Sequence, residues 1–261
     1  MKEFPLLQFE LNNPSIFQDR HVPPDSSLIG MAALVHSLNV EAPVRKPACV
    51  SEHRLKGTKR ETGEWWIFDS KYSVDNTFEA HLVFALRHED LDLLVLKRVF
   101  MAISEEALAD YVKSAPTGPL VRRIWFLYEF LTEKILDVPD SGKVSNVDLL
   151  DSKDYFVATG VVSPRHRVRN NLLGTTRFCP VIRRTRSLNA LVAKQLSAHA
   201  QKLFDRVSPL LIARAASFLL LADTQASFAI EGERLPLNTR ERWLKAVQQF
   251  HSVGSNGPRQ R

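Results

Sequence analysis

The sequence predicts a mainly α-helical protein, with a helical N-terminal domain that carries a small β element and is followed by further helices. Three observations support this prediction. Apolar residues recur every three or four positions over about residues 77–136, which is typical of the buried faces of helices. The same spacing returns over residues 187–230. β-branched and aromatic residues between turn residues cluster near residues 48–72, which indicates the small β element.

The N-terminal segment, residues 1–26, is expected to be an extended arm. It contains few periodic apolar positions and leads into a turn at the double proline that precedes Asp25. Asp25 and Ser26 are both suitable N-cap residues. We therefore expect a helix from about Ser27 to Leu38.

The middle of the chain is expected to contain one hairpin and then several helices. Turn residues at Thr62-Gly63 followed by the aromatic run Trp65–Phe68 indicate a short hairpin. Helical spacing begins after Thr77, and Ser104 is a good N-cap because two glutamates follow it in the first turn. A further helix should begin at Pro119, since proline favours the first helical position.

The domain organisation follows from these elements. Residues 27–160 form the predicted N-terminal, mainly helical domain, and residues 161–186 form a basic connecting segment. Residues 187–252 are expected to be helical, with one helix from Ser187 to about Phe204 and another from Ser208-Pro209 to about Ile230. Residues 253–261 are rich in glycine and polar residues, so we expect a disordered tail.

Composition favours a globular, cytoplasmic protein. Of the 261 residues, 44% are hydrophobic and 25% are charged, which argues against a disordered or fibrous class. Cys49 and Cys179 are too few for a disulfide framework and show no metal-ligand spacing. We expect no signal peptide, and the most apolar run, residues 209–222, is broken by Arg214 and too short for a membrane span.

The most informative local motif is S-F-A-I-E-G at residues 227–232. Ser227 and Glu231 are four positions apart, so they lie one turn apart on the same face of a helix. Gly232 permits a left-handed C-cap directly after the glutamate. A carboxylate at a helix C-terminus is disfavoured by the helix dipole, so its presence calls for a basic partner.

The wider run S-F-A-I-E-G-E-R-L-P, residues 227–236, with R-E-R-W at residues 240–243, resembles the inhibitory-helix region of Fic-family proteins. In that family a helix with the pattern Ser/Thr-x-x-x-Glu-Gly/Asn precedes or follows the catalytic core. Three further stretches resemble the long N-terminal region of some bacterial Fic proteins. They are L-R-H-E-D-L-D-L-L-V-L-K-R at 86–98, R-H-R-V-R-N-N-L-L-G at 165–174 and R-F-C-P-V-I-R-R-T at 177–185.

This resemblance implies a protein adenylyltransferase, which transfers AMP from ATP to hydroxyl groups of target proteins. The family's core carries the motif H-x-F-x-D/E-G-N-G-R, in which the histidine is the base and the glycine-rich turn holds the phosphates. The inhibitory glutamate pairs with an arginine of that motif. By this resemblance Ser227, Glu231 and Gly232 form the inhibitory motif, and residues 187–252 correspond to the start of a Fic domain.

The catalytic motif itself is missing from this sequence. None of the eight histidines is followed two positions later by phenylalanine. We therefore expect a chain truncated before its core, inactive alone, with no catalytic residue and no metal site. ATP and Mg²⁺ are expected only with a Fic core, supplied in cis or in trans, and the apolar helix at 209–230 predicts self-association.

The basic connecting segment offers an alternative function, that of a nucleic-acid-binding regulator. Seven arginines occur within residues 165–186 of a chain with a net charge of +6, enough for several phosphate contacts. The candidate contact residues are Arg165, Arg167, Arg169, Arg183 and Arg184. However, Phe178 is the only aromatic ring in the segment, so we expect that the arginines instead pair with acidic residues elsewhere.

His81 and His88 are seven positions apart on a predicted helix, beside two acidic residues. This pattern is compatible with metal ligands. We expect both histidines to be surface residues.

Overall fold

The computed structural model describes residues 13–232. The chain divides into two compact units, Met1–Arg184 and Thr185–Arg261. The described residues of the first unit are therefore 13–184, and those of the second are 185–232.

The described residues of the first unit form three small sheets. β1 (Ile16–Phe17) and β2 (Arg20–His21) form a hairpin. The four-stranded sheet has the order β3-β4-β6-β5, with a parallel β4–β6 pair and antiparallel pairs on either side. Its strands are β3 (Ser26–Ile29), β4 (Ala48–Ser51), β5 (Lys59–Glu61) and β6 (Trp66–Phe68). The third sheet, in the order β7-β9-β8, consists of β7 (Val147–Asp148), β8 (Val161–Ser163) and β9 (Val168–Asn170).

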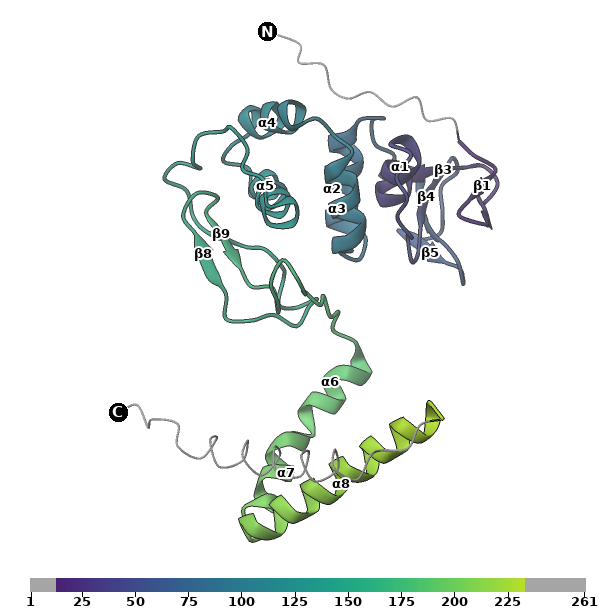
Figure 1. Cartoon of the computed structure of the whole chain (residues 1–261). Helices are drawn as coiled ribbons and strands as arrows, with labels where there is room; N and C mark the ends of the chain where they lie inside the picture. Colours follow the sequence, from purple (N-terminus) through teal and green to yellow (C-terminus); the bar gives the residue numbers. More distant parts are fainter. Residues whose placement is uncertain (1–12, 233–261) are drawn as a thin grey trace. The chain divides into compact units, whose positions relative to one another are not determined.

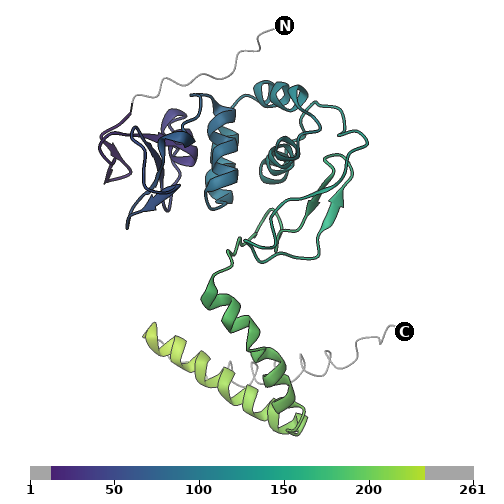
Figure 2. The same ribbon diagram turned by 180° about the vertical axis from the view of Figure 1, so that it is seen from behind.

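Helices fill the space between the larger sheets. They are α1 (Gly30–Ser37), a 3₁₀ turn η1 (Ser70–Tyr72), α2 (Phe78–His88), α3 (Leu93–Met101), α4 (Glu105–Ser114) and α5 (Pro119–Thr132). α1 contacts β3, β4, α2 and α3, whereas α5 contacts α3, α4 and β9. The four-stranded sheet therefore lies at one end of the first unit and the β7–β9 sheet at the other (Figures 1 and 2).

One continuous core joins these layers. The apolar face of α5 supplies its largest side chains, including Trp125 and Tyr128, which are fully buried. Phe100 of α3 lies against Tyr128 with ring centroids 5.5 Å apart. Burial of this kind stabilises a fold by about 25 cal/mol for each Å² of apolar surface removed from water.

The fold is mixed α/β, so the prediction of a mainly α protein with a small β element is wrong. Helices account for 43% of the described residues and strands for 13%, spread over three sheets. The strands are only two to four residues long. Such short strands give almost no alternating pattern, because that signal needs about four to eight residues.

The predicted helix from Ser27 to Leu38 begins later than expected. Ser26–Ile29 pairs with β4 as a strand, and α1 starts only at Gly30, whose φ of +64° turns the chain. The described part of the expected N-terminal arm, residues 13–26, contains the β1–β2 hairpin and the first residue of β3 rather than a plain extended segment.

Several helix boundaries agree with the sequence. Thr77 caps α2, Ser104 caps α4 through the amide of Ala107, and α5 begins at Pro119. The expected connecting segment up to Arg184 lies within the first unit. Its β8–β9 hairpin forms part of the third sheet, and Phe156 donates its amide hydrogen bond to the carbonyl of Ile182 over 2.9 Å.

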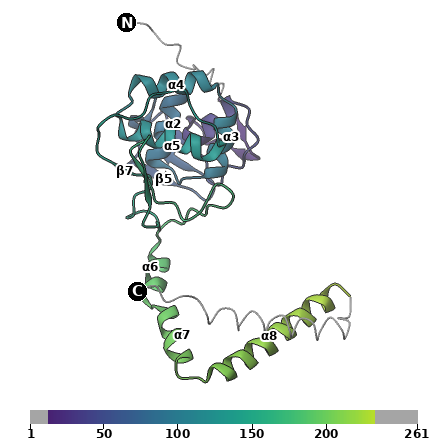
Figure 3. The same cartoon turned by 60° about the vertical axis from the view of Figure 1, so that its left-hand side comes forward.

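The second unit consists of helices over its described residues, 185–232. The single helix expected over 187–204 is broken into α6 (Arg186–Ala193) and α7 (Leu196–Phe204), because Gln195 takes a left-handed conformation with φ of +47°. α8 (Pro209–Ile230) follows, at an angle of 117° to the α6–α7 pair (Figure 3). The last part of the helical region expected over 187–252, from residue 233 onward, and the tail expected at 253–261 lie outside the described residues.

Candidate functional site

The sequence motif at residues 227–232 lies at the C-terminal end of α8. Glu231 is the C-cap residue, and Gly232 follows with φ of +72°, as the motif predicted. The amide of Glu231 donates to the carbonyl of Ser227 over 3.2 Å, and the amide of Gly232 donates to that of Ala229 over the same distance. Ser227 and Glu231 are therefore one turn apart, and both are exposed.

The surface around this helix end is unusually apolar. α8 is hydrophobic on most sides, yet none of its side chains is buried. Leu210, Phe218 and Ile230 are 72%, 71% and 87% exposed. Within residues 13–232, no ion pair involves Glu231. Over the described residues, both the carboxylate of Glu231 and the apolar sides of α8 are exposed.

The arginines of the basic segment lie in a different part of the chain and are mostly paired. Arg165 bonds to Glu129 over 3.2 Å and to Asp140 over 2.9 Å. Arg169 pairs with Asp148 over 2.9 Å, and Arg183 pairs with Asp90. Pairing reduces the charge that these arginines offer to phosphate groups.

The two remaining candidate arginines, Arg184 and Arg167, each take part in a hydrogen bond that involves a backbone carbonyl. Arg184 donates from Nε to the carbonyl of Ser152 over 2.8 Å, and its guanidinium lies 4.3 Å from the ring centre of Phe156. Arg167 adopts φ of +53°, and its carbonyl accepts a hydrogen bond from Arg122 over 2.9 Å. These contacts hold the segment of the β7–β9 sheet to neighbouring loops and to α5.

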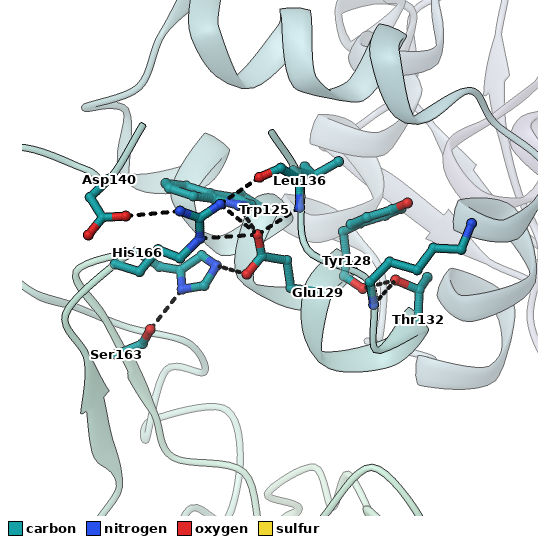
Figure 4. A network of polar contacts seen from close by, with 10 residues as sticks. Trp125, Tyr128, Glu129, Thr132, Leu136, Asp140, Ser163 and His166 are labelled. Atoms are coloured by element: carbon teal, nitrogen blue, oxygen red, sulfur yellow. Dashed lines mark hydrogen bonds and ion pairs between the residues drawn. The ribbon is translucent and has the colours of Figure 1, made fainter. Parts of the chain in front are cut away.

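A network around Glu129 was not predicted from the sequence. Glu129 Oε1 accepts from the indole of Trp125 over 2.7 Å and from the amide of Leu136 over 3.1 Å, and its Oε2 lies 3.0 Å from His166 Nε2 (Figure 4). His166 Nδ1 in turn lies 2.7 Å from Ser163 Oγ. The sequence signal that could have indicated this network is a single glutamate within the otherwise apolar run W-F-L-Y-E-F-L.

The Ser163–His166–Glu129 chain has the order of groups found in hydrolases, but its packing supports a structural role. His166 is only 5% exposed and lies against the rings of Trp125 and Phe126, at 4.4 and 5.3 Å between centroids. Burial alone would raise the pKa of Glu129, but hydrogen bonds from His166, Trp125 and Arg165 lower it to about 2. Glu129 therefore fastens the β8–β9 hairpin to α5.

A second, half-buried carboxylate, that of Glu89, lies at the start of α1. Ile29 offers no side-chain cap, and Glu89 accepts from the amide of Met31 over 3.2 Å while His81 Nδ1 accepts from the amide of Gly30 over 3.3 Å. Burial raises the pKa of Glu89 to about 8 and lowers that of His81 to about 4. Both residues cap a helix that is more than 50 positions away in sequence.

The expectation that both His81 and His88 are surface residues is wrong for His81. His81 is 2% exposed, and His88 is half-buried against the rings of Phe68, Tyr72 and Phe84. Across residues 13–232, no group of three or more histidine, cysteine, aspartate or glutamate side chains is arranged to hold a metal ion.

The two cysteines, Cys49 and Cys179, are both free thiols. Over the described part of the chain, no single helix is long and apolar enough to cross a membrane, although α6–α7 together with α8 pass that test of length and composition as a bent pair.

No family model, curated protein or solved structure matches this chain. Its function is therefore inferred from the residues themselves, and above all from those at the end of α8.

Proposed function

We propose that this chain is the regulatory part of a Fic-type protein, in which Glu231 restrains AMP transfer by a catalytic core. The observation that carries this proposal is the exposed position of Glu231 at the C-terminal end of α8, followed directly by left-handed Gly232. The S-F-A-I-E-G motif specifies this arrangement.

Two unfavourable free-energy contributions in α8 support the proposal that a partner binds this helix. A carboxylate at a helix C-terminus is destabilised by about 0.3–1 kcal/mol through the helix dipole. In addition, α8 leaves large apolar side chains such as Phe218 and Leu219 exposed, at 71% and 62%. A core that covers these side chains and presents a guanidinium to Glu231 offsets both costs.

The proposed inhibition is a competition for one arginine. The carboxylate of Glu231 would accept hydrogen bonds from an arginine of the core that otherwise holds a phosphate of ATP. A charge-assisted pair of this kind contributes about 1.5–3 kcal/mol, enough to shift an equilibrium more than tenfold. Ser227, one turn away, would orient the glutamate. ATP and Mg²⁺ would bind the core, which acts in cis or in trans, and the protein would work in the cytoplasm.

The test is AMP transfer by a fusion of this chain to the core of a Fic protein. Glu231→Gly should raise the rate more than tenfold, because it removes the competing charge. Ser227→Ala is the matched control and should change the rate much less, since a hydroxyl does not replace a charge. Equal rates for the parent fusion and Glu231→Gly would reject the proposal.

The chain alone is predicted to transfer no AMP. It lacks the H-x-F-x-D/E-G-N-G-R motif that the family's chemistry needs. Labelling by radioactive ATP that depends on a divalent metal and survives repurification would contradict this prediction.

A further inference from the structure

A cavity of about 340 Å³ opens in the first unit beside the N-terminal end of α3. The buried part of its lining is apolar and includes Met31, Val44 and Val95. The accessible part carries the basic side chains of Arg45 and Arg183. The volume lies within the range of sites that bind small molecules, which are mostly apolar with a few polar groups.

Basic groups gather at one side of this cavity, around Trp66. The ammonium groups of Lys46 and Lys59 lie 4.5 and 3.8 Å from the centre of the indole ring. Burial lowers the pKa of Lys59, and the positive charges of Arg183 and Lys46 lower it further. Positive charge is therefore concentrated here.

The acidic side chains of the lining are engaged within the chain. Asp90 pairs with Arg183, and Asp92 caps α3 by accepting from the amides of Leu94 and Val95. Glu89 caps α1, and with its pKa raised to about 8 by burial it is largely uncharged at neutral pH.

The basic and acidic groups of the lining are equal in number: Arg45, Lys46 and Arg183 stand against Glu89, Asp90 and Asp92. Two of the basic groups are paired, Lys46 with Glu61 and Arg183 with Asp90. Among residues 13–232, no ion pair involves Arg45. Arg45 therefore lies at the accessible side of the cavity, beside the apolar interior, with a guanidinium that these ion pairs do not engage.

We propose that this cavity binds a small organic anion, with its phosphate or carboxylate group against Arg45 and its apolar body against Val44 and Trp66. Guanidinium groups bind these oxyanions in a fork, and an indole ring offers a flat apolar face. The site belongs to the first unit and does not depend on the function proposed for Glu231.

Cys179 provides a direct reporter, because it lines the cavity as a half-buried thiol, whereas Cys49 is fully buried. The full chain is treated with N-ethylmaleimide at pH 7, and modification of each cysteine is followed by peptide mass. Phenyl phosphate or phenylacetate should slow the reaction of Cys179, by about threefold at twice the Kd. Whichever compound protects identifies the preferred oxyanion. Inorganic phosphate should protect less, and neutral benzyl alcohol should not protect.

Arg45→Gln tests the recognition of the charge without breaking an ion pair of the described residues. The Kd for the protecting anion should rise about tenfold in this variant. Arg169→Gln is the matched control, because Arg169 pairs with Asp148 away from the cavity, and its Kd should stay at the parent value. The proposal is overturned if neither anion protects Cys179, if benzyl alcohol protects equally, or if Arg45→Gln binds as tightly as the parent.

Discussion

Two glutamates of the first unit have pKa values that are shifted in opposite directions. Glu129 accepts hydrogen bonds from His166, Trp125 and Arg165, which hold its pKa at about 2 despite burial. Glu89 accepts from one backbone amide, that of Met31, so burial prevails and its pKa rises to about 8. The number of donors therefore decides which carboxylate is ionised at neutral pH.

Replacing Glu129 by glutamine should destabilise the first unit by about 2–4 kcal/mol, because the amide keeps only one of the two acceptor oxygens and loses the negative charge that faces His166 and Arg165. In the parent, a lowered pKa gives stability that is present above the unfolded value near 4.5 and is lost as the pH falls towards 2. Glu129→Gln should flatten this acid slope. Urea unfolding between pH 2.5 and 7 measures both effects.

Asp140→Asn is the control for Glu129, because Asp140 also bonds to Arg165 but is 69% exposed. Its loss should cost under about 1 kcal/mol. Equal costs for the two variants would contradict the structural role assigned to Glu129.

Replacing Glu89 by glutamine should change the stability on the alkaline side. The raised pKa of Glu89 means that the folded state keeps a proton that the unfolded state releases above pH 4.5, so stability falls as the pH rises to about 8. Between pH 4.5 and 6.5 this loss is offset by His81, whose lowered pKa makes stability rise with pH from about 4 to 6.5. The net loss lies between pH 6.5 and 8.

Glu89→Gln should remove this alkaline loss, which amounts to about 2 kcal/mol for one proton over that interval. Urea unfolding of the parent and the variant at pH 6.5 and 8.5 gives the comparison. If both proteins lose the same stability between these pH values, the carboxyl group of Glu89 is not the cause.

At the scale of elements, the sequence predicted helices better than strands. The helical spacing after Thr77, the cap at Ser104 and the start at Pro119 are local signals, and each was confirmed. β3 was predicted as helix, since its strand character comes from pairing with β4, more than 20 residues later. A strand that forms by pairing with a distant segment cannot be recognised from its own four residues alone.

The candidate sites were likewise predicted where they depend on neighbouring residues and missed where they depend on residues distant in the sequence. The geometry at the end of α8, with Gly232 left-handed after Glu231, followed from a six-residue motif. The partners of Glu89 and Glu129 were missed, because they come from residues up to 58 positions away. Only the fold brings these groups together.

The junction between β3 and α1 gives a prediction about backbone conformation. Gly30 has φ of +64°, and a Cβ there would overlap the Glu89 carboxylate. Gly30→Ala should therefore cost about 2–4 kcal/mol in unfolding free energy. Gly142→Ala is the control, because a Cβ at that position meets no atom within 4 Å, and thermal unfolding should leave it close to the parent. Similar melting temperatures for both variants would show that the turn tolerates a side chain.

At the scale of the molecule, the two units differ in whether their large apolar side chains are buried. The first unit buries its large side chains in a main core and a second, smaller cluster, whereas α6, α7 and α8 have no buried residue. Exposed apolar surface of this extent marks an interaction site. We assign the apolar surface of α8 to the proposed contact with a catalytic core.

Without a core, the purified chain should self-associate through α8. Sedimentation velocity should show an average mass that rises with concentration. Leu211→Asn with Phe218→Asn, at positions 57% and 71% exposed, should shift the protein towards the monomer. Leu94→Asn in the first unit, at 52% exposure, should leave the association unchanged. A parent chain that remains monomeric at all concentrations would remove this support for an uncovered surface.

The proposed role of Glu231 as an inhibitory carboxylate is tested most directly in trans. The purified chain is titrated into a Fic core from which its own inhibitory helix has been removed, and the rate of AMP transfer to a target protein is measured. We expect that the parent chain lowers the rate in a saturable manner and that Glu231→Gly binds the core but leaves the rate more than tenfold higher at saturation. An equal fall in rate with the parent and with Glu231→Gly, or no fall with either, would contradict an inhibitory role for Glu231.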